Sequence, residues 1–200
     1  MRAELLFSLL VCACTASFAA AAPRSSVPPA PALAPLPPPP TVPREVGLAS
    51  FAGVLSVLQS PRCQNCHPAG VAPLQTDAGV PHSMGITRDS PQVGLDCAAC
   101  HREVGLDLPN LPPASPHWHL PPAVQVFEGR SPAALCAQLL DPAQTGGRDL
   151  GALREHVKHD PLVLYAWSPG GGRTVPPLSH EAFVESFGAW VDAGAPCPAR

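Results

Sequence analysis

The sequence predicts a mainly α-helical domain with extensive irregular loops, and three observations lead to this prediction. Apolar residues repeat at helical spacing in several segments after residue 43. The 29 prolines and 16 glycines of the 200-residue chain interrupt the sequence between those segments. Strand patterns are nearly absent, and residues 162–167 form the one run that resembles a strand.

Residues 1–21 have the pattern of a secretory signal peptide. A basic start at Arg2 precedes an apolar run over 5–13, and small residues offer a cleavage site after Ala21. The run is too short to span a bilayer, so we expect export to the periplasm. A second interpretation attaches the chain to a membrane through a lipid on Cys14, because residues 11–14 resemble a lipobox. An uncleaved N-terminal anchor is the third.

Residues 22–43 are predicted to form a proline-rich linker. Ten of the 21 residues from 23 to 43 are proline, and such a run is stiff and extended because proline fixes φ and lacks a backbone donor. The linker either spaces the domain from a membrane or partner, or has no role beyond exposure. The folded domain is therefore expected to occupy residues 44–200.

The charge and composition exclude some classes of partner. A formal net charge of −3 and a pI near 6.2 do not provide the broad basic surface of a nucleic-acid-binding protein, so no nucleic-acid partner is expected. Aromatic residues make up only 5% of the chain. Because aromatic side chains bury the most apolar area each, we expect another group to fill part of the interior.

Two Cys-x-x-Cys-His motifs carry the strongest chemical signal. The motif is the attachment pattern of c-type haem: both thiols bond to the porphyrin and the histidine binds the iron. We therefore expect two covalently bound haem c groups, attached through Cys63, Cys66, Cys97 and Cys100 and ligated by His67 and His101. The alternatives are a Cys₄ zinc ribbon, a thioredoxin-like redox pair and two local disulfides. A ribbon needs no histidine after each cysteine pair, and the surrounding sequence lacks a βαβ pattern.

The spacing of the motifs predicts how the two haems are arranged. His67 and His101 are only 34 residues apart, which is too short for a complete single-haem fold between them. The two haems are therefore expected to share one core and to supply the apolar area that the chain lacks. On this interpretation the haem-free chain is largely unfolded.

Each iron needs a sixth ligand unless its site is left open. We expect His82 to bind one iron and His119 to bind the other. The competing candidates are Met84, His117 and His156.

Local patterns separate these candidates further. Residues 117–119 are expected to be extended, with both histidines on one face and Trp118 on the other. A helix predicted over residues 149–159 places His156 at the border of its apolar stripe and His159 in solvent. His180, after the predicted cap Ser179, is expected at the surface.

Three more helices and one cross-link complete the predicted fold. Apolar periodicity predicts a helix over residues 44–59, and the pair Ser131-Pro132 predicts a helix over 131–140. A last helix is opened by Ser179 and ended by Gly194. Cys136 and Cys197 remain once the signal-peptide and haem cysteines are set aside. In an oxidising compartment we expect them to form a disulfide, and two free thiols are the alternative.

These residues resemble a family of small exported dihaem proteins, often labelled as a subunit of isoquinoline 1-oxidoreductase. The similar segments are residues 62–68, 81–82, 97–101, 116–120, 146–150, 162–163 and 195–198, with His156, Trp167 and Trp190. The resemblance implies a cytochrome that passes electrons for a molybdenum hydroxylase. Family members often carry methionine near position 126, where this chain has Val126, which weakens any ligation scheme built on that position.

A shorter stretch is similar to the small dihaem subunit of periplasmic nitrate reductase. The similarity is a histidine between two closely spaced haem motifs, here His82, over about forty residues. It supports His82 as a sixth ligand, although that family's upstream histidine has no counterpart in this chain.

Together these observations predict an electron-transfer protein rather than an enzyme. We expect a periplasmic dihaem cytochrome that relays single electrons between a partner oxidoreductase and a respiratory acceptor. The alternative is a haem enzyme or sensor in which one iron keeps an open position for a small ligand or peroxide.

Overall fold

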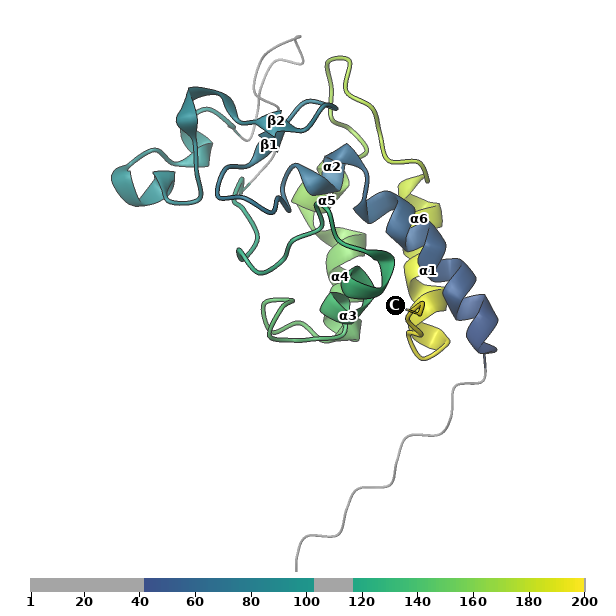
Figure 1. The fold of residues 1–200 in the computed structure, drawn as a ribbon. Coiled ribbons are helices and arrows are strands. Elements are labelled where there is room, and N and C mark those ends of the chain that lie inside the picture. Colours follow the sequence, from purple (N-terminus) through teal and green to yellow (C-terminus); the bar gives the residue numbers. More distant parts are fainter. Residues whose placement is uncertain (1–41, 103–116, 200) are drawn as a thin grey trace, which may run out of the picture. The chain divides into compact units, whose positions relative to one another are not determined.

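A computed structural model of the chain describes residues 42–102 and 117–199 (Figure 1). The predicted signal peptide, Cys14 and nearly all of the proline-rich linker lie outside the described residues. The chain divides into two units, Met1–Pro37 and Pro38–Arg200, and the described residues all belong to the second.

The first and last helices pack side by side in Figure 1. Helix α1 spans Arg44–Leu58 and helix α6 spans His180–Asp192, close to the predicted bounds. Gly47 lies against Ala193, whereas Gly53, six residues later, lies against Ser186, so the two helices run antiparallel. The rings of Phe51 and Trp190 meet across this interface with centroids 5.2 Å apart.

The segment between α1 and residue 102 contains only short elements. Helix α2 (Pro61–Gln64) is followed by an antiparallel hairpin of β1 (Leu74–Gln75) and β2 (Val80–Pro81), in which Leu74 pairs with Pro81. Three 3₁₀ turns follow, η1 (Ser83–Gly85), η2 (Ser90–Val93) and η3 (Cys97–Ala99). This hairpin is the only sheet within the part of the chain that the structure describes.

Among the described residues between this segment and α6 are three helices: α3 (Pro132–Leu139), α4 (Leu150–His159) and α5 (Pro161–Tyr165). Ser131, Asp149, Asp160 and Ser179 each accept a hydrogen bond from a backbone N–H in the first turn of α3, α4, α5 and α6. Such caps satisfy donors that the helix itself leaves unpaired.

The predicted strand-like run over 162–167 is wrong. Those residues belong mostly to helix α5, because Asp160 caps its start and Pro161 occupies the first turn, where a missing N–H costs nothing. With this correction the described residues are partly helical, with six α-helices, little strand and long irregular loops. The predicted mainly α class is confirmed at that level.

A protein core lies between the helices. Its buried apolar side chains come from α1, α3, α4 and α6 and from two loops: Phe51, Val54, Val57, Leu58, Phe127, Leu135, Cys136, Leu139, Leu153, Val157, Phe183, Phe187, Trp190 and Ala195. These side chains form a core by themselves, and the expectation that two haems supply the apolar area that the chain lacks stays a prediction. The few aromatic residues are concentrated in this core, which explains how an aromatic-poor chain builds it.

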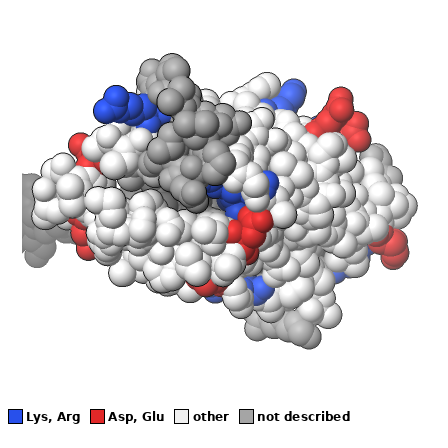
Figure 2. Space-filling model, turned by 90° about the horizontal axis from the view of Figure 1, so that it is seen from above, with Lys and Arg blue, Asp and Glu red and all other residues white. Residues whose placement is uncertain are grey.

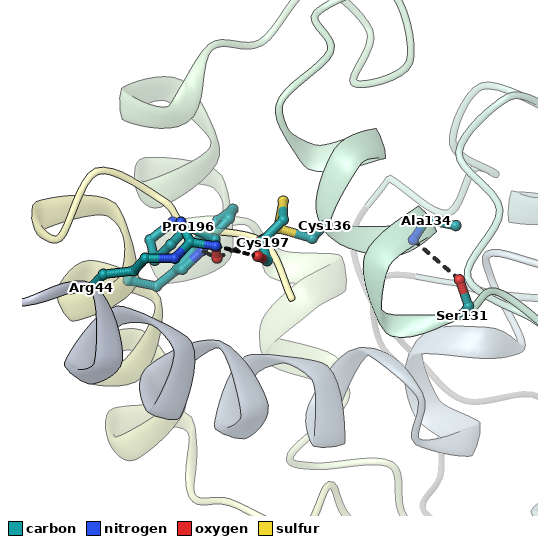
Figure 3. Close-up of a disulfide and its surroundings, with 7 residues drawn as sticks. Arg44, Ser131, Ala134, Cys136, Pro196 and Cys197 are labelled. Atoms are coloured by element: carbon teal, nitrogen blue, oxygen red, sulfur yellow. Dashed lines mark hydrogen bonds between the residues drawn. A yellow bond between two sulfur atoms is a disulfide. The ribbon is translucent and has the colours of Figure 1, made fainter. Parts of the chain in front are cut away.

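The C-terminal tail is tied to the core (Figure 3). A disulfide joins Cys136 on α3 to Cys197 in the tail. The carbonyl of Cys197 accepts a hydrogen bond from Arg44 at 2.8 Å, and the carbonyl of Pro196 accepts one from Trp190 at 3.0 Å. The tail thus connects α1, α3 and α6.

Candidate functional site

The first Cys-x-x-Cys-His motif lies on a helical turn beside a cavity. Pro61 starts α2 after Ser60, and the turn continues through the motif because the N–H of His67 donates to the carbonyl of Cys63 at 3.0 Å. Helical winding places residues three and four apart on one face. Cys63, Cys66 and His67 accordingly all line the same cavity.

The cavity has a volume of about 180 Å³. Its apolar wall includes Leu139, Leu153, Phe183 and Phe187 from three helices of the core. For comparison, an apolar cavity of about 150 Å³ accepts a benzene ring. The site is therefore a partly open, mainly apolar space bordered by two thiols and an imidazole.

The His67 imidazole is held from two sides. Its Nδ1 is 2.9 Å from the carbonyl oxygen of Gln125, so Nδ1 carries the proton and donates it. Its ring stacks on Phe127 with centroids 3.8 Å apart and an interplanar angle of 7°. Burial lowers the pKa of His67 to about 4. The imidazole is therefore neutral at pH 7, and its Nε2 lone pair is available to a metal.

The two thiols of the first motif are protonated at neutral pH. Burial raises the pKa of Cys63 to about 12 and that of Cys66 to about 11. The charge of Cys97 adds to the rise at Cys66, so the second motif lies within electrostatic range of the first. The two motifs are therefore neighbours in space as well as in sequence.

The second motif forms a similar turn at a more exposed place. Turn η3 begins at Cys97, and the N–H of His101 donates to the carbonyl of Cys97 at 2.8 Å. Cys97 is half-buried and Cys100 is exposed. The His101 ring packs on Trp118 with centroids 4.3 Å apart.

His82 lies next to His101. The two imidazole centroids are 6.0 Å apart, and Nδ1 of His82 donates to the carbonyl of Ser83 at 2.8 Å, which leaves its Nε2 free. Met84, in the following turn, is 85% exposed. The structure thus brings His82 close to the second motif.

The expected extended conformation of residues 117–119 is wrong. His117 has φ of 58°, in the left-handed region, so the chain turns instead of alternating. His119 lines the first cavity, and its Nδ1 donates to the carbonyl of His117 at 2.6 Å. Trp118 packs instead against His101 of the second motif. The segment therefore sends side chains toward both motifs.

The remaining histidines differ in what their nitrogens contact. His156 lines the first cavity, whereas His159 is exposed, as expected. His180 is half-buried rather than at the surface, and its Nε2, the atom usually left for a metal, is 2.9 Å from the carbonyl of Val157.

An ion pair that the sequence did not indicate holds the first motif in place. Arg62 is buried, and its Nη2 lies 2.5 Å from Oδ1 of Asp77 in the turn of the β1–β2 hairpin. Asp77 also accepts a hydrogen bond from the N–H of Thr174 at 3.1 Å. No periodicity or motif links these residues, since they meet only through the tertiary fold.

The donor set fits haem better than a bare metal ion. Among the residues the structure describes, no group of three or more His, Cys, Asp or Glu side chains is placed to hold a metal ion. A haem iron needs only one or two protein ligands, because the porphyrin provides the other four. The convergence of two thiols and the Nε2 of His67 on one mainly apolar cavity is compatible with that need.

Comparisons with known proteins identify no relative: no family model, no curated protein and no solved structure matches this chain. Within residues 42–102 and 117–199, no helix is long and apolar enough to cross a membrane. On the face in Figure 2, acidic and basic side chains are scattered among uncharged ones.

Proposed function

We propose that this chain is a dihaem c-type cytochrome that relays single electrons in the periplasm. The observation that carries the proposal is the convergence of Cys63, Cys66 and His67 on one cavity with two further imidazoles in its lining. When bound, the two haems supply reversible one-electron chemistry. The protein's part is to attach them, to ligate their irons and to exclude water.

At the first site each residue has a distinct role. Cys63 and Cys66 attach the porphyrin, and His67 is the proximal ligand. Gln125 and Phe127 fix the orientation of the His67 ring, and a hydrogen bond of this kind also raises the basicity of the ligating nitrogen. The apolar wall keeps the environment of the iron dry.

At the second site Cys97 and Cys100 attach the porphyrin and His101 is the proximal ligand. His82 is the sixth ligand, because its ring centre lies 6.0 Å from that of His101 with Nε2 free. Metal–imidazole bonds of about 2 Å allow one metal atom between two rings at such a separation.

The proximity of the motifs supports transfer between the haems. Cys66 and Cys97 lie within electrostatic range, so an electron that enters at one site has a short path to the other. The donor or acceptor is a redox partner protein, and a molybdenum hydroxylase is the class that the family resemblance implies.

The proposal is tested by counting haems on the mature protein. We expect the haem c α-band after reduction, a pyridine haemochrome yield of two per chain, and an intact mass above that of the polypeptide by two haems. Colourless protein with the mass of the bare chain would refute the proposal. A Cys97→Ser/Cys100→Ser variant is the control, and it retains one haem.

A further inference from the structure

Helix α4 presents one face to the first cavity. Leu153, His156 and Val157 are spaced i, i+3 and i+4, so they share a side of the helix, and all three line the cavity. Leu153 is 6% exposed and Val157 is 7% exposed. Two buried neighbours on a regular helix therefore fix the direction of the His156 side chain.

A carboxylate then fixes the rotation of the His156 ring. Nδ1 of His156 lies 3.1 Å from Oδ2 of Asp160. The other carboxylate oxygen, Oδ1, accepts the N–H of Leu162 at 2.8 Å and caps helix α5. Because both oxygens are engaged, Asp160 cannot turn away, and the His156 ring offers Nε2 as its free nitrogen.

His119 is the competing imidazole of the same cavity. It is exposed and lies in a loop, and its Nδ1 donates to a backbone carbonyl rather than to a carboxylate. His156 is half-buried on a helix. His67 and His156 line the same cavity.

We propose that His156, positioned by Asp160, is the sixth ligand of the haem iron that His67 binds. This inference rests on the proposed function. It replaces His119 as the expected ligand of that iron and gives Asp160 a role that the sequence did not suggest. A carboxylate that accepts the Nδ1 proton makes the imidazole a stronger donor and so stabilises the ferric state.

The first test removes the ligand. Reduced wild-type protein is expected not to bind carbon monoxide at either haem. His156→Ala is expected to bind it at one haem of the two, whereas His119→Ala is expected to resemble wild type. His156→Met, which keeps a ligand if the alanine variant does not fold, is expected to raise the midpoint potential of one haem.

The second test changes the positioning residue. Asp160→Asn retains an oxygen that can cap α5 but removes the negative charge on the His156 side. We expect the midpoint potential of one haem to rise while its low-spin spectrum remains. The same helix provides the matched control: Glu155 lies 3.5 Å from His159, also four residues apart, and both are largely exposed. Glu155→Gln and His159→Ala are expected to leave both potentials unchanged.

Several results would overturn the inference. One is carbon monoxide binding by His119→Ala but not by His156→Ala. Another is carbon monoxide binding at this haem in wild type, which would mean that its iron is open. The third is an unchanged midpoint potential in His156→Met. If Asp160→Asn has the same midpoint potentials as wild type, Asp160 does not position the ligand. A haem count of two in these proteins keeps the proposed function intact in each case except an open iron in wild type, which would favour the haem enzyme or sensor. Haem-free wild-type protein would refute the proposed function itself.

Discussion

Arg62 precedes the first Cys-x-x-Cys-His motif, and its charge partner comes from a segment that only the tertiary fold brings near. Its side chain is 4% exposed, and Asp77 is the partner of its Nη2, while its Nε has no partner among the described residues. A buried charge is costly unless it is paired. Asp77 therefore stabilises the turn that carries Cys63.

Replacing Asp77 by asparagine should weaken the fold in a pH-dependent way. Burial acts to raise the pKa of Asp77, but hydrogen bonds from Thr174 and the charges of Arg62 and Arg173 outweigh it and lower the pKa below its ordinary value. The carboxylate therefore stabilises the protein above about pH 4, and this contribution is lost as the pH falls through the lowered pKa. We expect Asp77→Asn to cost about 1–2 kcal/mol at pH 7.

The measurement is urea unfolding of both proteins at pH 7 and at several values below pH 4. The difference between them should shrink toward acid. Asp89→Asn is a suitable control, because the side chain of exposed Asp89 has only a weak contact with Gln92 at 3.4 Å. A stability gap that does not change with pH would contradict this account of Asp77.

At the residue scale the sequence identifies chemistry but not contacts. The spacing within the first motif is enough to select Cys63, Cys66 and His67, because these residues lie within about one helical turn of each other. The partners Gln125, Phe127 and Asp77 come from distant segments, so no local pattern could name them.

Helices α1 and α6 approach closely where α1 has a glycine. A Cβ added at Gly47 would lie 2.6 Å from Cγ of Pro196 and 2.7 Å from Cβ of Ala193. Real Cβ atoms do not approach that closely, so the backbone or the tail would have to move. The glycine is therefore required by packing and not by its backbone conformation.

Gly47→Ala should destabilise the protein by about 1–3 kcal/mol through overpacking. The same change at Gly151 in α4 is the matched control, because the nearest atom to its added Cβ is Oδ1 of Asp149 at 3.4 Å. There alanine should stabilise by up to about 1 kcal/mol, since glycine disfavours a helix. Urea denaturation measures the change in the free energy of unfolding for each variant. Equal changes at Gly47 and Gly151 would exclude the packing explanation.

The helices are largely predictable because their apolar spacing and caps agree. Ser131 followed by Pro132 predicts a helix start, and α3 begins there. Asp160 followed by Pro161 is the same kind of signal, yet the apolar run after it suggests a strand. Over so short a segment, a capping residue followed by proline is thus a better guide to a helix than an apolar run is to a strand.

The two motifs stand in different surroundings within the same unit. The first borders a cavity with core side chains in its wall, and the second lies on short 3₁₀ turns with its cysteines half-buried or exposed. If both motifs carry haem as proposed, the haem at the first motif should contribute more to folding than the haem at the second.

Serine replacement of each cysteine pair tests this asymmetry. Closed core cavities cost about 24 cal/mol per Å³, so the partly open space of about 180 Å³ sets an upper bound of roughly 4 kcal/mol, or a fall in Tm of about 10 °C for a chain of this size. We expect such a fall for Cys63→Ser/Cys66→Ser and only a few degrees for Cys97→Ser/Cys100→Ser. Thermal unfolding with a haem count on each variant checks this, and similar falls for both would show that the sites contribute equally.

The position of the disulfide limits the order in which the molecule can be completed. Cys197 comes 61 residues after Cys136, so the bond between them cannot form until the ribosome has made α4, α5 and α6. Phe183 and Phe187, which form part of the cavity wall, are also made late because they lie on α6. Until α6 is made and packed, the cavity beside the first motif lacks Phe183 and Phe187, so a haem bound as proposed would have access to Cys63 and Cys66 before the disulfide closes.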